Sequence, residues 1–354
     1  MADIGTKLQA PSIRSGNSGA KDVTYYLRMA QGAQGRESPH SPLVTVVMLS
    51  YSHPEFLEQA LESIARQTYP NLEVIVVNNR SPQTEAIREL VAGYPKFRLI
   101  AINHNSGYTG GMNEGIRHAT GKYIYLTEED MVTEPGAIAA MVEYMESDSR
   151  AGMTSGVIDD HLGATIFAGG FTELGKVFKQ FLFGRGTPVL PPIGGPFCMN
   201  YASGALMMFR RAALEELGGF REDFFMYYED VEMCQRFRRT NRAIVLVPTA
   251  RAVTLGEGPL KVDSRHVSYH KMKNLMAVSL LYIRLREIPE FLLRYAVWNL
   301  LRDCLRNRSA ALALFCADLW IAANFPRLMW DRWRFARRQQ SNETEFCSVG
   351  AHSV

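Results

Sequence analysis

Strongly apolar segments alternate with helical patterns from Leu43 onward, and this alternation restricts the fold more than any other feature of the sequence. The first segment, LVTVVMLSY, is followed by residues 52–65, where apolar side chains recur at helical spacing after SHPE, which has the form of a capping box. Continuous apolar strands are typical of sheets that are buried on both faces. The alternation therefore predicts an α/β fold with a mostly parallel sheet flanked by helices.

The same unit recurs over the first third of the chain. Further strands are predicted at Glu73–Asn79, Phe97–Asn103 and Tyr123–Leu126, with helices between them. After about residue 150 the alternation gives way to Gly-rich and Pro-rich segments, and residues 264–340 have a helical pattern. We expect the less regular middle part to extend the same sheet and the last part to form a helical region.

Composition limits the class of protein. The chain has 354 residues, 47% of them hydrophobic, and a net charge of +3, which is too small to indicate nucleic-acid binding. Its five cysteines form no metal-type spacing, which fits a reduced, cytoplasmic protein. The first residues contain no apolar stretch of the kind found in signal peptides.

Three consecutive carboxylates, Glu128, Glu129 and Asp130, directly follow the strand YIYL. In open parallel sheets, ligands bind beyond the carboxyl ends of the strands. A cluster of carboxylates there can hold a divalent cation, which would neutralise the phosphates of a nucleotide. A solvated turn has the same sequence pattern, so both interpretations remain open at this point.

A glycine-rich segment, Asn103–Gly115, precedes the third predicted helix. Glycines let the backbone approach a ligand closely, and amides at the start of a helix can face a phosphate; a flexible loop is the alternative. The segment matches neither GxGxxG nor GxxxxGK[ST], which disfavours dinucleotide-binding and P-loop proteins.

A second acidic group, the pair Glu229 and Asp230, begins a predicted helix after two tyrosines. A carboxylate at this positive end stays ionised and can accept a proton, although N-capping explains the pair equally well. His266 and His270 share a helix face, but without an HExxH glutamate a metal role is disfavoured.

The C-terminal region combines apolar, aromatic and basic residues. Residues 309–325 are apolar but are interrupted by Asp318 and are short for a membrane span. Residues 326–338 interleave arginines with Trp330, Trp333 and Phe335. This mixture suits a helix lying on an anionic membrane surface, and it equally suits packing against the protein.

Taken in order, these segments resemble family-2 glycosyltransferases of the GT-A fold, in particular the rhamnosyltransferase-like branch. The resemblance covers Leu43–Asn274. It implies a GT-A (Rossmann-like) mixed sheet with a nucleotide-sugar-binding half at 43–135 and an acceptor-binding half at 136–263. We expect a helical region at 264–340, flanked by a disordered or extended segment at 1–42 and a flexible tail at 341–354.

The resemblance also implies a reaction and its residues. The reaction is an inverting transfer of a sugar from a UDP- or dTDP-sugar to a hydroxyl of a glycan, lipid-linked glycan or natural product. Asp230, beside Glu229, resembles the catalytic base. The donor site is expected at Ser50, Tyr51, Asn78, Asn105, Gly107, Gly111, Asn113, Glu128 and Glu129. A loosely bound Mg²⁺ or Mn²⁺ is expected at Asp130, Glu128 and, weakly, Thr254.

Three of these positions depart from the family pattern. Asn78 stands where an aspartate is usual, Glu128 replaces the first aspartate of the DxD motif, and Thr254 replaces a histidine ligand. These departures keep open a second hypothesis, a catalytically silent GT-A domain used for binding or scaffolding. A nucleotidyltransferase is disfavoured, because SYSHPE follows the first strand where a Gly-rich, Arg-bearing loop would be needed.

The expected surroundings follow from the same reasoning. We predict no nucleic-acid partner and a cytoplasmic location, with peripheral contact to the inner face of the cell membrane through the C-terminal basic aromatic helix. A homodimer remains open.

Overall fold

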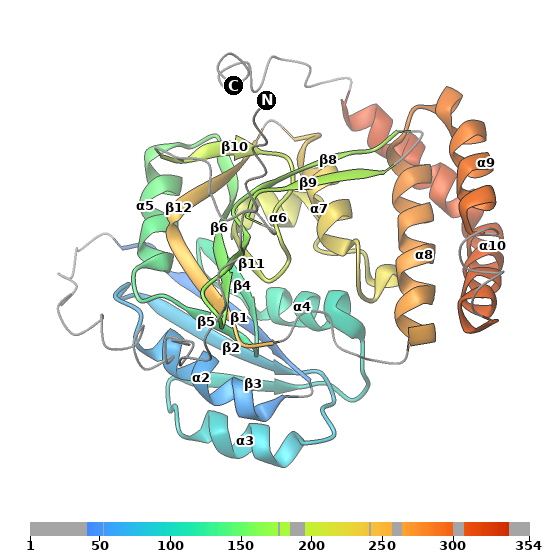
Figure 1. Ribbon diagram of the computed structural model, residues 1–354. Coiled ribbons are helices and arrows are strands. Elements are labelled where there is room, and N and C mark those ends of the chain that lie inside the picture. The colour runs from blue at the N-terminus through green and yellow to red at the C-terminus, as the bar shows by residue number, and fades with distance from the viewer. Residues whose placement is uncertain are drawn as a thin grey trace, which may run out of the picture.

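The computed structural model describes residues 41–51, 53–175, 178–184, 195–240, 242–256, 264–299 and 308–339. Its strands are β1 (Val44–Ser50), β2 (Leu72–Asn78), β3 (Phe97–Ala101), β4 (Tyr123–Glu128), β5 (Met131–Thr133), β6 (Ala151–Asp160), β7 (Thr165–Phe167), β8 (Gly170–Glu173), β9 (Lys179–Leu182), β10 (Phe197–Met199), β11 (Leu206–Arg210) and β12 (Ala243–Thr254). Within the described residues, ten of them form one mixed sheet, and β8 and β9 form a separate hairpin (Figure 1).

The N-terminal part of the sheet is parallel, as predicted. The order is β3-β2-β1-β4, and every residue of β1 is buried because helices cover both of its faces. The four parallel strands consequently end at one edge, which gathers the residues after Ser50, Asn78 and Glu128.

The middle part of the chain extends the same sheet. Strand β11 runs antiparallel to both β4 and β6, and β12 lies parallel to β6. Short β5 pairs with the end of β12, where Met131 is opposite Thr254. This pairing brings Thr254 next to Asp130, although the two residues are far apart in the sequence.

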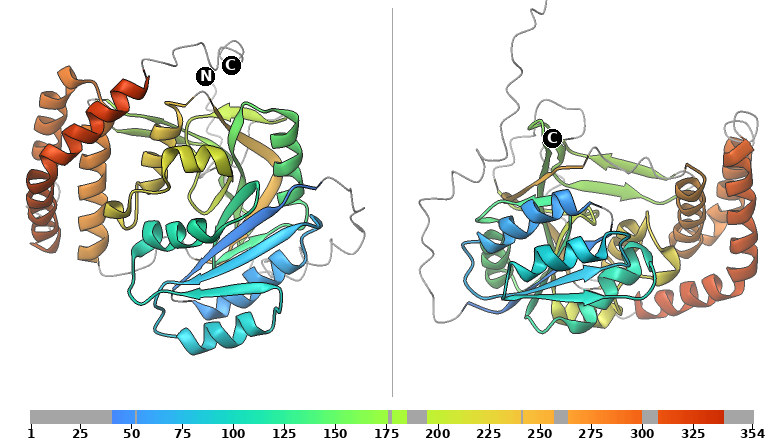
Figure 2. Two further views of the ribbon diagram at one scale, coloured as in Figure 1. Left: turned by 180° about the vertical axis from the view of Figure 1, so that it is seen from behind. Right: turned by 90° about the horizontal axis from the view of Figure 1, so that it is seen from below.

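Helices cover the sheet on both faces. The helices of the described residues are α2 (Pro54–Ala65), α3 (Thr84–Ala92), α4 (Gly107–His118), α5 (Ala137–Ser147), α6 (Arg211–Leu217), α7 (Glu229–Phe237), α8 (Ser264–Tyr282), α9 (Ile288–Asn299) and α10 (Arg308–Gln339), with short 3-10 turns η2 (Glu222–Phe224) and η3 (Leu285–Glu287). Helices α2 and α3 lie on one face and α4 and α6 on the other, while α8, α9 and α10 stand at one side beyond α7 (Figures 1 and 2). The helical C-terminal region is thereby confirmed.

Two local predictions need correction. Helix α2 begins at Pro54, a residue that suits the first helical position, and its N-cap is His53, which makes no side-chain capping bond. The predicted cap, Ser52, is outside the described residues. Helix α4 begins at Gly107, so the glycines lie inside the helix and not before it.

The glycines of α4 are needed for packing. A Cβ on Gly111 would lie 2.3 Å from Cδ1 of Leu49, and one on Gly115 would lie 2.2 Å from Cγ1 of Val47. Both contacts are shorter than any real packing distance. These glycines therefore let α4 approach β1 closely. The same glycine-rich pattern in a sequence fits this structural role as well as it fits ligand binding.

Candidate active site

The segment after β1 is held by Glu129, the middle carboxylate of the acidic cluster. One of its oxygens accepts hydrogen bonds from the Ser50 hydroxyl (2.6 Å) and the Tyr51 N–H (3.1 Å), and the other accepts one from the His53 N–H (3.1 Å). Glu129 is buried, whereas the Tyr51 side chain is exposed. Glu129 thus fixes the backbone of this segment and leaves the Tyr51 ring accessible to a ligand.

The predicted pocket residue Asn78 shapes the turn after β2. Its side-chain oxygen accepts a hydrogen bond from the Ser81 N–H (2.8 Å), and its amide donates to the Thr84 hydroxyl (3.1 Å). Asn78 is fully buried. A carbonyl oxygen has a second lone pair, so this bond to Ser81 does not exhaust its capacity to accept.

Asn79, which the sequence analysis did not single out, connects this turn to α4. Its side-chain oxygen accepts from the Ser106 N–H (2.9 Å), and its amide donates to the Gly107 carbonyl (2.9 Å) and to Asn105 (3.2 Å). The exposed Asn105 also accepts from the Gly107 N–H (2.9 Å). The start of α4 is therefore fixed against the end of β2.

Asn113 lies one helical turn and a half further along α4 and faces the protein interior. Its amide donates to the Phe220 carbonyl (2.9 Å) and its oxygen accepts from the Phe220 N–H (2.8 Å). The buried Asn113 side chain therefore secures the turn after α6 in this structure. Its expected contact with the donor remains a prediction.

Glu128 and Asp130 lie at the carboxyl end of β4, as the strand pattern predicted. The Thr254 hydroxyl donates to Oδ2 of Asp130 (3.2 Å), and a Cβ on Gly256 would lie only 2.5 Å from that oxygen. Burial raises the pKa of Glu128 to about 8, and the charges of Asp130, Glu129 and Asp230 add to the effect. Burial also raises the pKa of Asp130, although the bond from Thr254 opposes it.

Such a site suits a hard cation only in part. Among the described residues, no three Asp, Glu, His or Cys side chains are grouped so that they could hold a metal ion. The Asp130 carboxylate, the Glu128 carboxylate and the Thr254 hydroxyl nevertheless offer the oxygen ligands that Mg²⁺ and Mn²⁺ prefer. The absence of a side chain at Gly256 accommodates the Asp130 carboxylate in this position.

Glu229 and Asp230 begin α7 close to this cluster. Asp230 accepts hydrogen bonds from the Tyr201 hydroxyl (2.6 Å) and from the Val231 N–H (2.7 Å). Burial raises the pKa of Asp230, while these bonds to the ionised form lower it. Tyr201 is a partner that sequence reasoning missed, because it lies in a segment with no recognisable periodicity.

Glu229 differs from its neighbour. Its Oε2 atom is buried and has no hydrogen-bond partner, and burial, followed by the charge of Asp230, raises its pKa well above the ordinary value. Burial of this kind favours the neutral form of a carboxyl group. The two members of the acidic pair therefore differ in their hydrogen bonding, since Asp230 has two donors and Oε2 of Glu229 has none.

The residues that lead into α7 have unusual backbone conformations. Phe225, Tyr227 and Tyr228 have φ values of 65°, 66° and 63°. Residues with side chains rarely adopt positive φ; each instance costs about 1–3 kcal/mol and persists only where the surrounding structure imposes it. Such strain is concentrated at functional sites, so it supports the view that Asp230 belongs to one.

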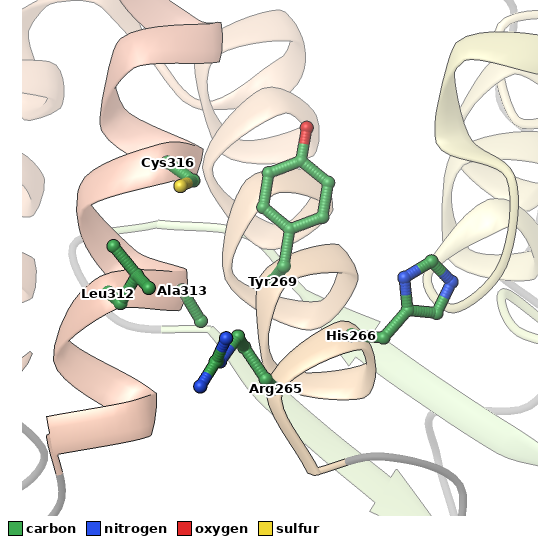
Figure 3. A pocket seen from close by; sticks show the side chains of 6 residues that line it. All are labelled: Arg265, His266, Tyr269, Leu312, Ala313 and Cys316. Carbon is green, nitrogen blue, oxygen red and sulfur yellow. The ribbon is translucent and has the colours of Figure 1, made fainter.

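The two histidines of α8 pack against this strained turn. The His270 ring stacks on Phe225 (centroids 4.9 Å apart), and His266 contacts both rings. Burial lowers the pKa of His270 to about 3, so it is neutral. His266, together with Arg265 and Tyr269, also lines a pocket of about 430 Å³ between α8 and α10 (Figure 3).

The structure thus brings most of the predicted residues to one edge of the sheet. Tyr108 lies near both acidic groups: its hydroxyl donates to the Gly204 carbonyl (2.7 Å), and its pKa is raised by burial and then by the charges of Glu128, Glu229 and Asp230. Gly111 and Asn113 instead have their closest neighbours inside the protein.

The mixed sheet, its order and the acidic groups at its carboxyl edge define a GT-A fold. Residues 45–218 match the family described as glycosyl transferase family 2. This match confirms the resemblance to family-2 glycosyltransferases that the sequence predicted.

Individual relatives agree with this assignment. An N-acetylglucosaminyl-diphospho-decaprenol L-rhamnosyltransferase of Mycobacterium tuberculosis is 26% identical over 238 residues, which are 60% of this chain and 75% of the relative. An uncharacterized glycosyltransferase of Haemophilus influenzae is 29% identical over 111 residues, which are 31% of this chain and 34% of that protein. The chain therefore spans only part of these relatives.

Solved structures share the fold at low sequence identity. The mannosyltransferase PcManGT from Pyrobaculum calidifontis, in complex with GDP-Man and Mn²⁺, has a TM-score of 0.50 and 20% identity, with 90% of this chain and 91% of that chain covered. GalNAc-T7 with UDP, GalNAc and Mn²⁺ has a TM-score of 0.55 and 14% identity, with coverages of 76% and 57%.

Proposed function

We propose that this protein transfers a sugar from a nucleotide diphosphate donor, of the UDP or dTDP type, to a hydroxyl group of an acceptor with inversion at the anomeric carbon. The observation that carries the proposal is Asp230, a carboxylate with two hydrogen-bond donors placed beside the acidic end of β4. The match to glycosyl transferase family 2 and the GT-A neighbours, one with GDP-Man and one with UDP and GalNAc, support it.

The chemistry of the proposed reaction assigns separate tasks to the residues. Ionised Asp230 takes the proton from the acceptor hydroxyl as its oxygen attacks the anomeric carbon and the bond to the diphosphate breaks. The Tyr201 hydroxyl and the Val231 N–H stabilise the charged form of Asp230 before the transfer. Because the attack is direct, no covalent sugar–enzyme intermediate forms.

Asp130 and Glu128 would hold a divalent cation together with Thr254. When bound, the cation neutralises the negative charge of the departing diphosphate. A threonine hydroxyl is a weak ligand, so we propose loose binding that donor phosphates and water complete. Both fold neighbours contain Mn²⁺, one with GDP-Man and the other with UDP and GalNAc, which supports this assignment.

Thermal shift with a panel of donors tests the proposed class. UDP-, dTDP- and GDP-sugars are added to the protein with and without manganese, and the shift of the melting temperature is measured. A ligand that binds only the folded state at about 100 times its Kd stabilises by about 2.7 kcal/mol. Stabilisation by a nucleotide sugar without any transfer would favour the silent binding domain, and no stabilisation by any donor would contradict both hypotheses.

Tyr51 gives a sharper prediction for the donor site. We expect Tyr51→Ala to weaken nucleotide binding by about tenfold, because an exposed ring beside the β1 edge offers a stacking surface worth about 1–3 kcal/mol per base. Tyr51→Phe keeps the ring and should bind nearly normally. Calorimetry with UDP and dTDP measures both variants, and an unchanged Kd in Tyr51→Ala would remove this residue from the site.

Asn78→Ala tests the predicted second pocket residue. We expect it to weaken UDP or dTDP binding, because the substitution removes an acceptor and releases the turn at Ser81. Ser81→Ala is the matched control, since it leaves the backbone N–H that bonds Asn78 intact. Equal nucleotide affinity in wild type and Asn78→Ala, measured by the same calorimetry, would contradict the assignment.

Helix α10 supports the proposed membrane contact, because it has two apolar faces. One face, with Ala313, Leu314, Ala317, Ile321 and Leu328, is buried. The other carries the outer stripe, Leu312, Phe315, Leu319, Trp330 and Trp333, whose exposed fractions range from 42% to 59%. Exposed Arg327 and Arg334 flank this stripe, as expected for a helix lying on an anionic surface.

The same helix contains a stretch, Ala311–Phe335, that is long and apolar enough to cross a membrane. Its inner face, however, packs along α8, and Arg332 donates to the Leu280 carbonyl (2.8 Å). We therefore propose that α10 lies on a membrane and does not cross it, which would bring the site to a lipid-linked acceptor. The lipid-linked acceptor in the name of the Mycobacterium relative is consistent with this proposal.

Vesicle sedimentation tests the outer stripe in the full-length protein. We expect Leu319→Glu to reduce partitioning into phosphatidylglycerol-containing vesicles by about tenfold or more, since burying a leucine is worth about 1.5–3 kcal/mol. High salt should also release the wild type, because it screens the arginines. Leu162→Glu, at another exposed leucine, is the matched control. Equal partitioning of both variants, or loss of a dimer in Leu319→Glu, would make the stripe a protein contact.

A further inference from the structure

The turn that precedes Asp230 is unusually constrained. Phe225 has φ 65° and ψ −62°, at the centre of a three-residue turn that the bond from the Met226 N–H to the Phe224 carbonyl (2.8 Å) closes. Tyr228, the N-cap of α7, is left-handed with φ 63°. A γ-turn of this sign is rare and strained, so contacts from elsewhere have to maintain it.

One side chain of α8 supplies most of these contacts. The amide nitrogen of Asn274 lies 2.8 Å from the carbonyl oxygens of both Phe224 and Met226 and 2.7 Å from that of Tyr227. An asparagine amide has two N–H groups, which these three acceptors share. Asn274 is fully buried, and its own oxygen has no hydrogen-bond partner.

A second element holds the turn from the other side. The Thr109 N–H of α4 donates to the Phe225 carbonyl (3.1 Å), and a Cβ on Gly107 would lie 2.4 Å from that same oxygen. The turn is thus enclosed between α4 and α8, and Figure 1 shows both helices beside the start of α7. Asp230 lies only two residues after Tyr228, so it closely follows this turn in the chain.

We propose that Asn274 is a positioning residue for the transfer reaction: by binding three carbonyl groups of the strained turn, it sets where α7 begins and thus where the Asp230 carboxylate lies. The inference rests on the proposed function for the role of Asp230. Asn274 does not touch the acceptor or the donor; it acts through the turn. Its unpartnered oxygen is consistent with a residue retained for its amide donors.

The experiment compares Asn274→Ala and Asn274→Asp with Tyr282→Phe. Asn274→Asp keeps the shape but replaces the donors with oxygen atoms that repel the carbonyls. Tyr282 is the matched control, because it also lies on α8 and its hydroxyl donates a hydrogen bond to Glu232 of α7 (2.7 Å), which is outside the turn. Three quantities are measured: amide hydrogen exchange in residues 223–231, donor Kd, and kcat with its pH profile.

We expect both Asn274 variants to exchange faster in residues 223–231 and to lose about 10²-fold in kcat, the effect expected of a misplacement of about 1 Å, with donor Kd nearly unchanged. The acid limb of the pH profile should also shift. Tyr282→Phe should retain kcat even if its melting temperature falls as much as that of the Asn274 variants. Unchanged exchange in the turn, or a kcat loss that merely follows the melting temperature in all three variants, would overturn the inference.

Hydrogen exchange separates this inference from the proposed function. If the wild type transfers no sugar, the proposed function fails, yet the exchange measurement still decides whether Asn274 holds the turn. If Asn274→Asp does not fold, Asn274→Ala decides.

Discussion

Replacing Asp230 with asparagine should lower the turnover of sugar transfer by about 10²-fold or more while leaving donor affinity nearly unchanged. Asparagine keeps the size of the side chain and can still accept the hydrogen bond from Tyr201, but it cannot take a proton. A 10²-fold loss corresponds to about 2.7 kcal/mol of transition-state stabilisation. Steady-state kinetics and calorimetry with the donor measure the two quantities separately.

Glu229→Gln is the matched control for this prediction. Because burial raises the pKa of Glu229 and so favours its neutral form, a neutral glutamine should replace it well, and we expect a much smaller loss of turnover. Near-normal turnover in Asp230→Asn would contradict the assignment of the base. An equal loss in both variants would indicate that the acidic pair acts as a unit.

The pH dependence of turnover follows from the same residue. Asp230 acts only when ionised, and burial raises its pKa above that of an exposed aspartate. Turnover should therefore decline as pH falls through this raised pKa, at a higher pH than for an exposed aspartate. The decline should disappear from the residual activity of Asp230→Asn.

The second large effect concerns the acidic end of β4. We expect UDP or dTDP to strengthen manganese binding, and Asp130→Ala to abolish this coupling and weaken binding by about tenfold or more, since the charge of the ligands sets the affinity. Thr254→His should tighten binding, because an imidazole is a better Mn²⁺ ligand than a hydroxyl and Thr254 already lies beside Asp130. Calorimetric titration of manganese with and without nucleotide measures these effects.

The alternative from the sequence, a solvated turn, makes the opposite prediction. If Glu128, Glu129 and Asp130 only faced water, the protein would be fully active in EDTA and Asp130→Ala would remain active. The structure already separates Glu129 from its neighbours, because its carboxylate holds the segment after β1. We therefore expect Glu129→Gln to change folding stability. The manganese titration should distinguish the two variants, because only Asp130→Ala should abolish the coupling with nucleotide.

Local patterns were sufficient for the parallel half of the sheet. Strands β1, β2 and β4 are short, continuously apolar and bounded by polar turns, so burial on both faces was visible in the sequence. The position of Glu128 and Asp130 at a carboxyl edge followed directly, because it depends only on where one strand ends. The GT-A fold and the family were predicted from the resemblance of the ordered segments to family-2 glycosyltransferases.

Residue roles that depend on distant partners were less accessible. Gly111 fits its place because of Leu49 on another element, and Asn113 bonds the backbone of Phe220. Glycine and asparagine at a helix start suit ligand binding and internal packing equally well in a sequence. Only the packing of α4 on β1 distinguishes these two roles.

The sequence by itself determined the order of strands and helices in the first half, the acidic edge and the acidic pair at the start of α7, because these depend on neighbours in the chain. The tertiary structure alone decided that Tyr201 bonds Asp230, that Asn274 holds the strained turn and that α10 has a second, exposed apolar face. The physical reason is that hydrogen bonds and burial between residues far apart in the chain depend on how helices and strands pack, which no local periodicity records.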